Sequence, residues 1–434
     1  MSNKDVNIAV HHLTRVEGHG NIIFNAKDGV IEDVQWQVSE APRMFESFVR
    51  GRPYMQMSHV TSRICGICSI GHALASLKAT EAAMDIPVTE QTVQLRKIAL
   101  HAENMQSHIL HVGYLVAPDL FGAGSVFPMI ETHTDAVLNI IQLHRLANEM
   151  SDLLCGRTTH PITLMPGGFT QIPTESQLAN LRTRLEHILP VCDDVLQLVL
   201  DNAHALPDFS RETEYIALVS NSEYALYDGI IGSTDTGQHP VEEYESIANE
   251  YIVPYSTAKF ARHARESYMV GALARFNLNS EKLMPQAQKW ADKFGLKAIN
   301  YNPFMNNVAQ LLEYHHSVTD SIRLIDAILD TGLHPVSAPS YTVKAGRGIG
   351  AVEVPRGILF HDYTYNEQGI CTHANLIIPT NQNHCNINKD MQAFAPTLLN
   401  KPEKEIELNL EMLVRAYDPC ISCSAHYLTV KFKS

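Results

Sequence analysis

RICGICSIGH, at residues 63–72, is the first of two cysteine motifs in this chain, and the second, DPCISCSAH, occupies residues 418–426. Each contains a Cys-x-x-Cys pair, a spacing that lets both sulfurs turn toward one metal ion. Most of the chain lies between the two pairs, so its ends must meet in space if the pairs act together. We therefore expect one structural unit over residues 1–434 rather than separate domains.

The four cysteines of these motifs, Cys65, Cys68, Cys420 and Cys423, could supply four thiolates, which suit zinc, nickel or iron. A structural zinc site usually brings its two pairs together across a loop of roughly 15 to 20 residues, much shorter than the segment here. A thioredoxin-like redox motif would leave one of the two pairs unexplained. The spacing favours a redox-active cofactor site, with structural zinc as the open alternative.

Composition limits the class of protein. Hydrophobic residues make up 45% and charged residues 18% of 434 residues, which is typical of a folded globular protein. The 33 basic and 47 acidic residues give a net charge of -14, which would repel nucleic acid. We find neither a leader-like segment nor a run of roughly 18 apolar residues that could span a bilayer. These features predict a soluble cytoplasmic protein. A disulfide framework is not expected, because the eight cysteines are spread over a long chain.

Hydrophobic periodicity predicts strands at the N-terminus and long helices in the middle of the chain. We expect strands within residues 6–38, and helices at 71–84, 89–118, 133–155, 174–203, 318–333 and 403–415. Thr174 and Gln177 match a helix capping box. The pattern predicts an α+β fold, mainly helical, with a central bundle of long helices and small peripheral β-sheets.

Near the C-terminus the sequence predicts further strands. VEVPRGILF at 352–360 and ANLIIPT at 374–380 flank a turn at 366–369. The glycine-rich run at 346–350 lacks the strand and helix that a nucleotide-binding loop would need, so we expect a plain loop.

RICGICSIGH and DPCISCSAH resemble the first and last signatures of the large subunit of nickel-iron hydrogenases. Further motifs of that family follow in order: RVEGHG at 15–20, FESFVRGR at 45–52, SHILH at 107–111, PGGF at 166–169 and EVPRG at 353–357. In lacking long insertions, the sequence resembles the soluble cytoplasmic members of that family, including sulfhydrogenases and NAD-linked enzymes. The resemblance implies an oxidoreductase that reversibly splits dihydrogen into protons and electrons.

The resemblance also implies a cofactor, a Ni-Fe(CN)2(CO) centre. Cys65 and Cys420 would be terminal nickel ligands, while Cys68 and Cys423 would bridge nickel to the iron. Bridging thiolates would hold two soft metals together and leave an open position for dihydrogen. Thr380 would donate a hydrogen bond to a cyanide on the iron.

Proton transfer is the second task that the resemblance implies. The base would be the thiolate of Cys420 or the guanidine of Arg356, with Asp119 and Asp418 pairing with Arg356 to orient it. Seen alone, an arginine after a proline would be an ordinary surface or salt-bridging residue. Glu17 resembles the glutamate that relays protons away from the terminal cysteine.

Two further sites follow from the same resemblance. Glu46, the backbone carbonyl of Leu376 and His426 would bind Mg²⁺ or a similar divalent ion, and His72 would support a bridging cysteine. A maturation protease would remove residues 427–434 directly after His426.

Other titratable groups have simpler interpretations. His101, His108 and His111 recur at helical spacing and could form a second metal site, but buried helical histidines are more often hydrogen-bonded core groups. The four remaining cysteines lack paired spacing and are expected to be buried thiols: Cys155, Cys192, Cys371 and Cys385.

The expected partners follow from the need to carry electrons away from the metal centre. No Cys-x-x-Cys pair is left over for iron-sulfur clusters, so electrons would leave through an iron-sulfur small subunit, joined to diaphorase-type subunits with flavin and iron-sulfur clusters. The alternative from another class is a related respiratory-complex subunit that binds quinone without metal, although the four intact cysteines argue against it.

Overall fold

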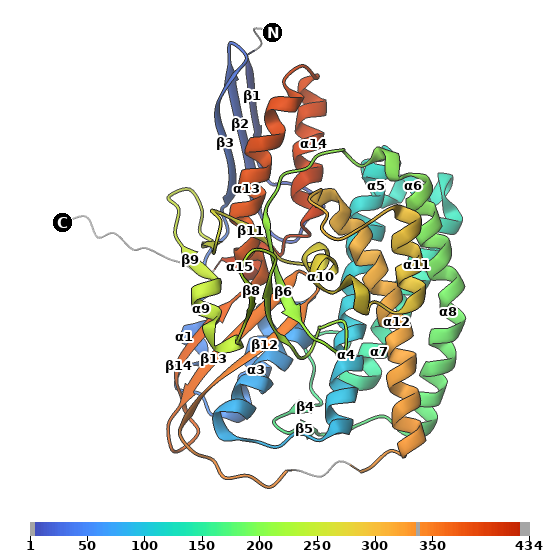
Figure 1. Ribbon diagram of the computed structural model, residues 1–434, viewed down its shortest axis with the longest axis vertical. Helices are drawn as coiled ribbons and strands as arrows, with labels where there is room; N and C mark the ends of the chain where they lie inside the picture. Colours follow the sequence, from blue (N-terminus) through green and yellow to red (C-terminus); the bar gives the residue numbers. More distant parts are fainter. Residues whose placement is uncertain (1–4, 336–338, 426–434) are drawn as a thin grey trace, which may run out of the picture.

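The computed structural model describes residues 5–335 and 339–425. Four long helices stand side by side in one half of the molecule (Figure 1): α4 (Glu90–Ile109), α7 (Thr134–Cys155), α8 (Glu175–Asp201) and α12 (Asn306–Thr331). Small sheets and shorter helices occupy the other half. The predicted α+β fold with a central helix bundle is confirmed.

Local capping explains where these helices begin. The Thr174 hydroxyl accepts the backbone N–H of Gln177, and the Gln177 side chain accepts the backbone N–H of Thr174, so the predicted capping box forms at the start of α8. At α4 the Thr89 side chain accepts the backbone N–H of Thr92. α7 ends at Gly156, whose φ of 71° suits glycine.

Two helix predictions need correction. α12 begins at Asn306, twelve residues earlier than expected, because its first half is buried on all sides and includes polar groups such as Glu313 and His316. The expected helix over 89–118 is interrupted: α4 ends at Ile109, a π-helical stretch follows over Leu110–Val116, and α5 (Ala117–Leu120) completes it. A buried polar face hides helical periodicity, and a π-helix leaves no clear sequence signal.

The predicted N-terminal strands form an antiparallel sheet of β1 (Val6–Val10), β2 (Gly20–Lys27) and β3 (Val30–Val38). Asp28 and Gly29 form the turn between β2 and β3, both with positive φ. This sheet extends beyond the bundle beside α13 (Pro379–Leu398) and α14 (Glu403–Ala416) (Figure 1).

A second sheet packs against α3 (Ser69–Met84), the helix that follows the first cysteine pair. It contains β12 (Gly346–Val354), β13 (Gly357–Tyr365) and β14 (Cys371–Ile377). The plain loop expected at 346–350 is therefore wrong, because alternate glycines there face α3. A Cβ atom on Gly346, Gly348 or Gly350 would lie about 2 Å from a backbone oxygen of α3. Only glycine allows this close approach of strand and helix.

The stretch VEVPRGILF is also not one strand. Val354 pairs with Gly357, so Pro355 and Arg356 form a two-residue turn between β12 and β13. Proline cannot donate to a strand ladder, which favours its place at the turn. The turn gives Arg356 a position that an unbroken strand would not.

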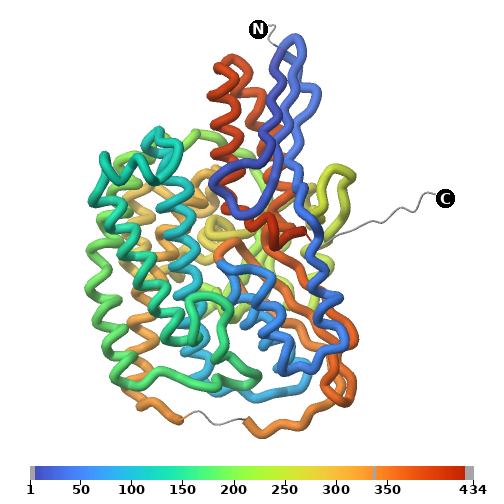
Figure 2. Tube along the Cα trace, turned by 180° about the vertical axis from the view of Figure 1, so that it is seen from behind, coloured from blue at the N-terminus to red at the C-terminus, as the bar shows by residue number. Residues whose placement is uncertain are grey.

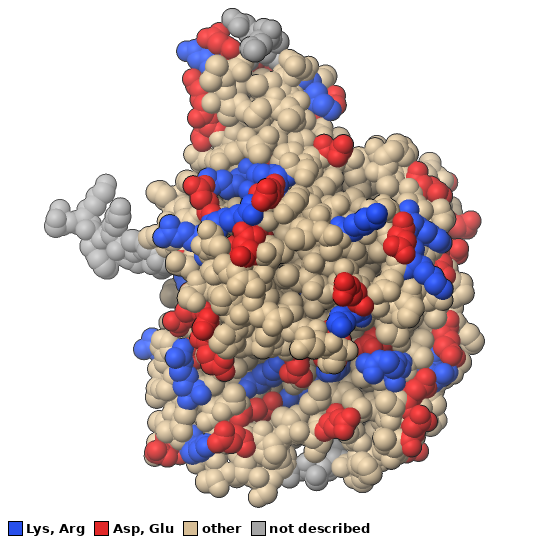
Figure 3. Space-filling view, in the orientation of Figure 1, with Lys and Arg blue, Asp and Glu red and all other residues tan. Residues whose placement is uncertain are grey.

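The remaining elements connect these layers. They are α1 (Phe45–Val49), α2 (Met57–Thr61), α6 (Val126–Thr132), β4 (Leu164–Met165), β5 (Gly168–Phe169), β6 (Glu214–Val219), β7 (Ile230–Ser233), β8 (Gly237–His239), α9 (Tyr244–Ile247), β9 (Asn249–Tyr251), β10 (Phe260–Arg262), β11 (Tyr268–Met269), α10 (Ala272–Asn279), α11 (Pro285–Phe294) and α15 (Ile421–Ser424). Among the described residues, no helix is both long and apolar enough to cross a bilayer. On the face drawn in Figure 3, acidic and basic side chains are interspersed rather than gathered in one basic field.

The two ends of the chain meet beside the second cysteine pair. Figure 2 shows the segment after β1 next to α15, and the backbone N–H of Ile421 donates to the carbonyl of Glu17 over 2.9 Å. One apolar core includes residues from Val6 to Ala425. The contact that the two motifs required is therefore present.

Candidate metal centre

Four buried thiols converge where the two chain ends meet. The sulfurs of Cys65 and Cys420 are 3.5 Å apart, and the sulfurs of Cys65, Cys420 and Cys423 all lie within 4.8 Å of one another. Cys68 lines the same small cavity, and its backbone N–H donates to the Cys65 sulfur over 3.1 Å. The two predicted pairs form one cluster.

Local structure orients these thiols. Cys68 is the N-cap of α3, so the positive end of that helix dipole lies beside the first pair, where it favours thiolate. Hydrogen bonds from Cys420, Cys423 and Cys68 hold the pKa of the Cys65 thiol well below its usual range. The hydrogen bond to Cys65 and burial raise the pKa of Cys68 well above that range. One thiol of the cluster therefore loses its proton readily, whereas a second thiolate beside it is disfavoured. A bound soft metal cation would balance the charge of the further thiolates.

Arg356 closes one side of the cavity. Its Nη1 lies 3.3 Å from the Cys68 sulfur, and its Nη2 and Nε donate to Oδ1 and the backbone oxygen of Asp418 over 2.8 and 2.6 Å. Burial opposes its charge, but Asp418 and the thiols of Cys68 and Cys420 outweigh burial and raise the pKa of Arg356 further above its usual value. A permanent positive charge therefore faces the sulfurs.

A second buried arginine, Arg275, stabilises the turn that contains Arg356, and the sequence analysis did not identify it. Arg275 donates to the carbonyl oxygens of Val354 and Pro355 over 2.9 and 3.0 Å. Its other contacts are with the carboxylates of Glu313 and Glu353. Arg275 thereby fixes the two residues that precede Arg356.

The predicted pairing of Asp119 with Arg356 is wrong. Asp119 instead binds Arg15 over 2.6 Å and Arg415 over 2.9 Å, and no ion pair to Arg356 exists among the described residues. The π-helical stretch before α5 shifts the position of Asp119 from that of a continuous helix. Asp119 therefore joins the N-terminal loop to α14 through Arg15 and Arg415.

Glu17 lies against the second cysteine pair. Its carboxylate accepts the Ser422 hydroxyl over 2.5 Å and the Ser422 backbone N–H over 3.1 Å, and its backbone forms an isolated bridge with Cys420. The structure therefore places Glu17 beside Cys420, the cysteine from which it was expected to relay protons.

Thr380 and His72 also line the cavity. The Thr380 hydroxyl oxygen accepts the Cys420 backbone N–H over 3.1 Å, so its own proton is free to point elsewhere. His72 Nδ1 lies 3.1 Å from Nε2 of His361 on β13. The Thr380 hydroxyl is thus available to an acceptor in the cavity.

Two of the three residues expected to bind magnesium are neighbours. Glu46 Oε1 accepts the backbone N–H of Leu376 over 3.0 Å. His426, the third, lies outside the described residues, as do residues 427–434.

The predicted histidines, two on α4 and one on the π-helical stretch after it, are hydrogen-bonded core groups, as expected. His108 contacts Glu313, and His111 contacts Gln310. His101 forms a cluster with His316 and Asp320 that the sequence did not reveal. His316 Nδ1 accepts the backbone N–H of Met284, so neutral His316 keeps its proton on Nε2 and does not offer that atom to a metal. The four unpaired cysteines are buried, also as expected.

Glu103 is a further residue that sequence reasoning missed. It is fully buried, accepts the backbone N–H groups of Ile70 and Gly71 at the start of α3, and burial raises its pKa to about 8. The sequence signal that could have identified Glu103 was its place on the same predicted helix as His101 and His108.

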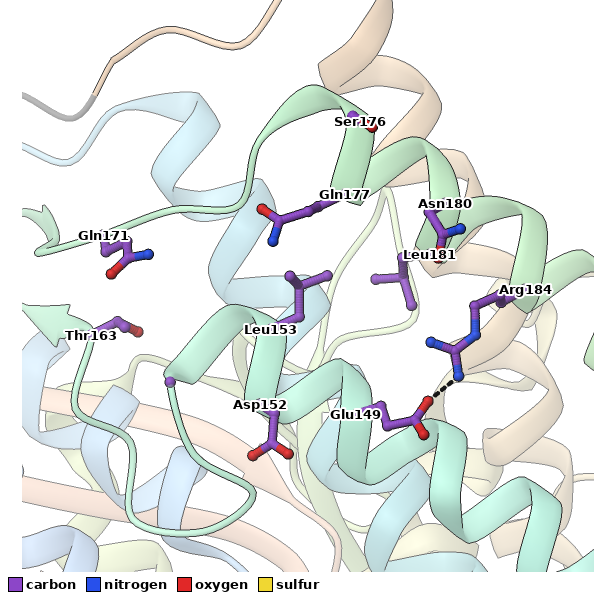
Figure 4. Close-up of a pocket in the computed structure, with 11 residues that line it drawn as sticks. Glu149, Asp152, Leu153, Thr163, Gln171, Ser176, Gln177, Asn180, Leu181 and Arg184 are labelled. Carbon is purple, nitrogen blue, oxygen red and sulfur yellow. Dashed lines mark hydrogen bonds and ion pairs between the residues drawn. The ribbon is translucent and has the colours of Figure 1, made fainter.

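A larger open groove lies elsewhere, between α7 and α8, with a volume of about 700 Å³ (Figure 4). Glu149 and Arg184 form an ion pair across it. None of the residues that line the cysteine cavity lines this groove. The groove and the cysteine cavity are therefore separate sites in the fold.

Comparisons with known proteins agree with this geometry. The sequence matches the nickel-dependent hydrogenase family over residues 43–127 and 210–426. It is 30% identical to the alpha subunit of sulfhydrogenase 1 from Pyrococcus furiosus, over 98% of this chain and 99% of that protein. It is 28% identical to the beta subunit of NAD-reducing hydrogenase HoxS from Cupriavidus necator, over 97% and 95%.

Solved structures show the same likeness. An NAD⁺-reducing [NiFe]-hydrogenase in the H2-reduced state superposes with a TM-score of 0.88 at 25% identity, covering 97% of this chain and 99% of that chain. The [NiFeSe]-hydrogenase of Desulfomicrobium baculatum shares the fold, with a TM-score of 0.76 at 22% identity over 97% and 100%.

The fold and the thiol cluster define a metal-dependent redox enzyme, and the chain belongs to the nickel-dependent hydrogenase family. It is the large, catalytic subunit of a [NiFe]-hydrogenase, an oxidoreductase that acts on dihydrogen.

Proposed function

We propose that the four cysteines divide the ligation of the nickel-iron centre, with Cys65 and Cys420 as terminal nickel ligands and Cys68 and Cys423 as bridges to iron. Four buried sulfurs within one small cavity suit two soft metals. The centre would supply an open coordination position at which dihydrogen is split. The convergence of the thiols under the Arg356 guanidinium is the observation that supports this proposal most strongly.

The chain's own residues would manage charge and protons around that position. Arg356, held by Asp418, places a fixed positive charge over the Cys68 side of the cavity and excludes water there. The Cys420 thiolate would accept the first proton, because the Arg356 guanidinium is already protonated and its pKa is raised further by Asp418 and the thiols; Glu17 would receive that proton next. Thr380 would donate a hydrogen bond to a cyanide on iron, while His72 would support the bridging Cys68.

We further propose a magnesium or similar ion held by Glu46, the carbonyl of Leu376 and His426. The contact between Glu46 and Leu376 supports a site at this edge of β14, and a hard ion with few protein ligands keeps several waters. Its role would be to fix the C-terminal segment that follows the second cysteine pair.

Electrons must reach an acceptor outside this chain. We propose an iron-sulfur small subunit as the immediate partner, with flavin-containing diaphorase-type subunits beyond it, because a relative is the subunit of an NAD-reducing hydrogenase. The resemblance to cytoplasmic hydrogenases supports a cytoplasmic location. We also propose that residues 1–434 act as one unit from which a maturation protease removes 427–434; intact-mass measurement would then find a chain ending at His426.

The test is infrared spectroscopy of the purified complex together with a nickel assay. We expect bands of metal-bound CO and cyanide, about one nickel per chain, and loss of both in Cys65→Ser and Cys420→Ser. Cys192→Ser, a buried cysteine away from the cluster, is the matched control and should keep both. A wild-type complex with zinc in place of nickel and no such bands would refute the proposal.

A further inference from the structure

A line of hydrogen bonds leads from Glu17 to the molecular surface. The Ser422 hydroxyl lies 2.5 Å from Glu17 Oε1 on one side and 3.4 Å from Glu40 Oε1 on the other. The same oxygen of Glu40 lies 3.0 Å from Nδ1 of His19. The His19 side chain is 63% exposed, whereas that of Glu40 is 16% exposed. Each group can accept and donate a proton in turn, so the line is chemically continuous.

From this arrangement we propose that Ser422, Glu40 and His19 conduct protons between Glu17 and solvent. The inference rests on the proposed function, in which Glu17 receives the proton released from dihydrogen. A protonated Glu17 gives its proton to the Ser422 oxygen while the Ser422 hydroxyl proton moves to Glu40. Glu40 then releases it to His19 Nδ1 or to water, and the Ser422 hydroxyl, which now points at Glu17, rotates toward Glu40 before the next proton arrives. One proton enters and one leaves, so the relay needs no other reactant.

The position of Ser422 between Cys420 and Cys423 makes it the natural exit from Glu17. Both side-chain hydrogen bonds of Glu17 within the described part of the chain end on Ser422, one on its hydroxyl and one on its backbone N–H. The backbone N–H donor fixes the carboxylate, and the hydroxyl is the group that can pass a proton onward.

Gly18 lets these groups approach one another. Its φ is +87°, and an added Cβ would lie 2.7 Å from the Ser422 nitrogen and 2.8 Å from Glu40 Oε1. A side chain at this position would push apart Ser422 and Glu40, the longest link of the line. The His19 backbone N–H also donates to Glu40 Oε1 over 2.8 Å, which holds that carboxylate toward Ser422.

The test compares two isotope reactions in the purified complex. Conversion of para- to ortho-hydrogen needs only reversible splitting in the cavity, whereas exchange of D2 with H2O also needs proton exit to solvent. We expect Ser422→Ala and Glu40→Gln to slow exchange by about tenfold or more, with conversion, nickel content and infrared bands close to wild type. Ser422→Thr keeps a hydroxyl and should restore exchange. His19→Asn should slow exchange about twofold, because water can also reach Glu40.

Two matched controls separate this effect from a general loss of charge. Glu32 is an exposed carboxylate on β3 and His373 an exposed histidine on β14, so Glu32→Gln and His373→Asn should exchange at the wild-type rate. Wild-type exchange in both Ser422→Ala and Glu40→Gln would overturn the relay, as would an equal loss of exchange and conversion, which indicates a structural role. A wild-type complex that does neither reaction would instead refute the proposed function.

Discussion

Arg356 is bound to Asp418 through two separate atoms of the same residue. Its Nη2 lies 2.8 Å from the Oδ1 carboxylate oxygen and its Nε lies 2.6 Å from the backbone oxygen. Asp418 has a φ of 50°, a left-handed conformation that turns both groups toward the guanidinium. The remaining Nη1 is thereby aimed at the Cys68 sulfur.

Replacing Arg356 by lysine should abolish most activity without removing the metals. Lysine keeps a charge, but one ammonium cannot hold both Asp418 acceptors and also face Cys68. We expect kcat to fall by about 100-fold, with nickel content unchanged by metal analysis. Arg347→Lys is the matched control, since Arg347 pairs with Asp362 on β12 and β13 away from the cavity. Equal activity of the wild type and Arg356→Lys would contradict the role of the guanidinium.

Arg275→Lys should destabilise the protein and also lower activity, although Arg275 does not touch the cysteines. The variant loses the donors that hold Val354 and Pro355 and weakens a fully buried ion pair with Glu313. We expect the free energy of unfolding to fall by about 3 kcal/mol, measured by urea unfolding. In the control Arg265→Lys, a partly exposed ion pair is altered and the change should stay below about 1 kcal/mol. An unchanged unfolding midpoint in Arg275→Lys would show that the turn is held by other contacts.

Gly348→Ala should prevent close packing of β12 on α3. The new Cβ would lie 2.1 Å from the Ala79 oxygen and 2.4 Å from the Ala83 nitrogen, which are backbone atoms that cannot rotate away. We expect a loss of about 3 kcal/mol or more, measured by thermal unfolding of the complex. Gly168→Ala, at a strand glycine with open space around it, should change stability by less than about 1 kcal/mol. Comparable stability of the two variants would contradict the glycine contact.

His384 should make stability fall as the solution becomes acidic. Burial lowers the pKa of His384 to about 3, and its Nδ1 accepts the Trp36 indole N–H over 2.9 Å, so the folded state favours neutral imidazole. The unfolded chain binds a proton near pH 6.5, so this contribution is present above that pH and is lost as pH falls toward 3.

We expect His384→Gln to remove that dependence, because glutamine keeps an acceptor and a donor but does not titrate. Between pH 7 and pH 4.5 the wild type should lose about 2 to 3 kcal/mol more stability than the variant, measured by urea unfolding with tryptophan fluorescence. Parallel losses in the two proteins would show that His384 does not cause the acid sensitivity.

Local chemistry of the sequence determined much of the fold and the four cysteines that the structure brings together. The capping box at Thr174 and Gln177, the turn at Asp28 and Gly29, and the Cys-x-x-Cys pairs depend on residues within a few positions of one another, and all were predicted. Such features need no knowledge of distant contacts, because short-range hydrogen bonds and φ preferences already select them.

Tertiary structure alone decided which distant groups meet. The partners of Asp119, the support of Arg356 by Arg275 and the contact of Ser422 with Glu40 join residues far apart in the chain. The strand at 346–350 depends on the packing of its glycines against α3, and the early start of α12 depends on buried partners for polar side chains. Hydrophobic periodicity in a sequence shows only which face of one helix or strand is buried. The polar side chains and glycines named above are buried by several elements at once, so no such pattern marks them. The sequence by itself therefore determined the four thiols, and the folded chain decided how charge and protons are arranged around them.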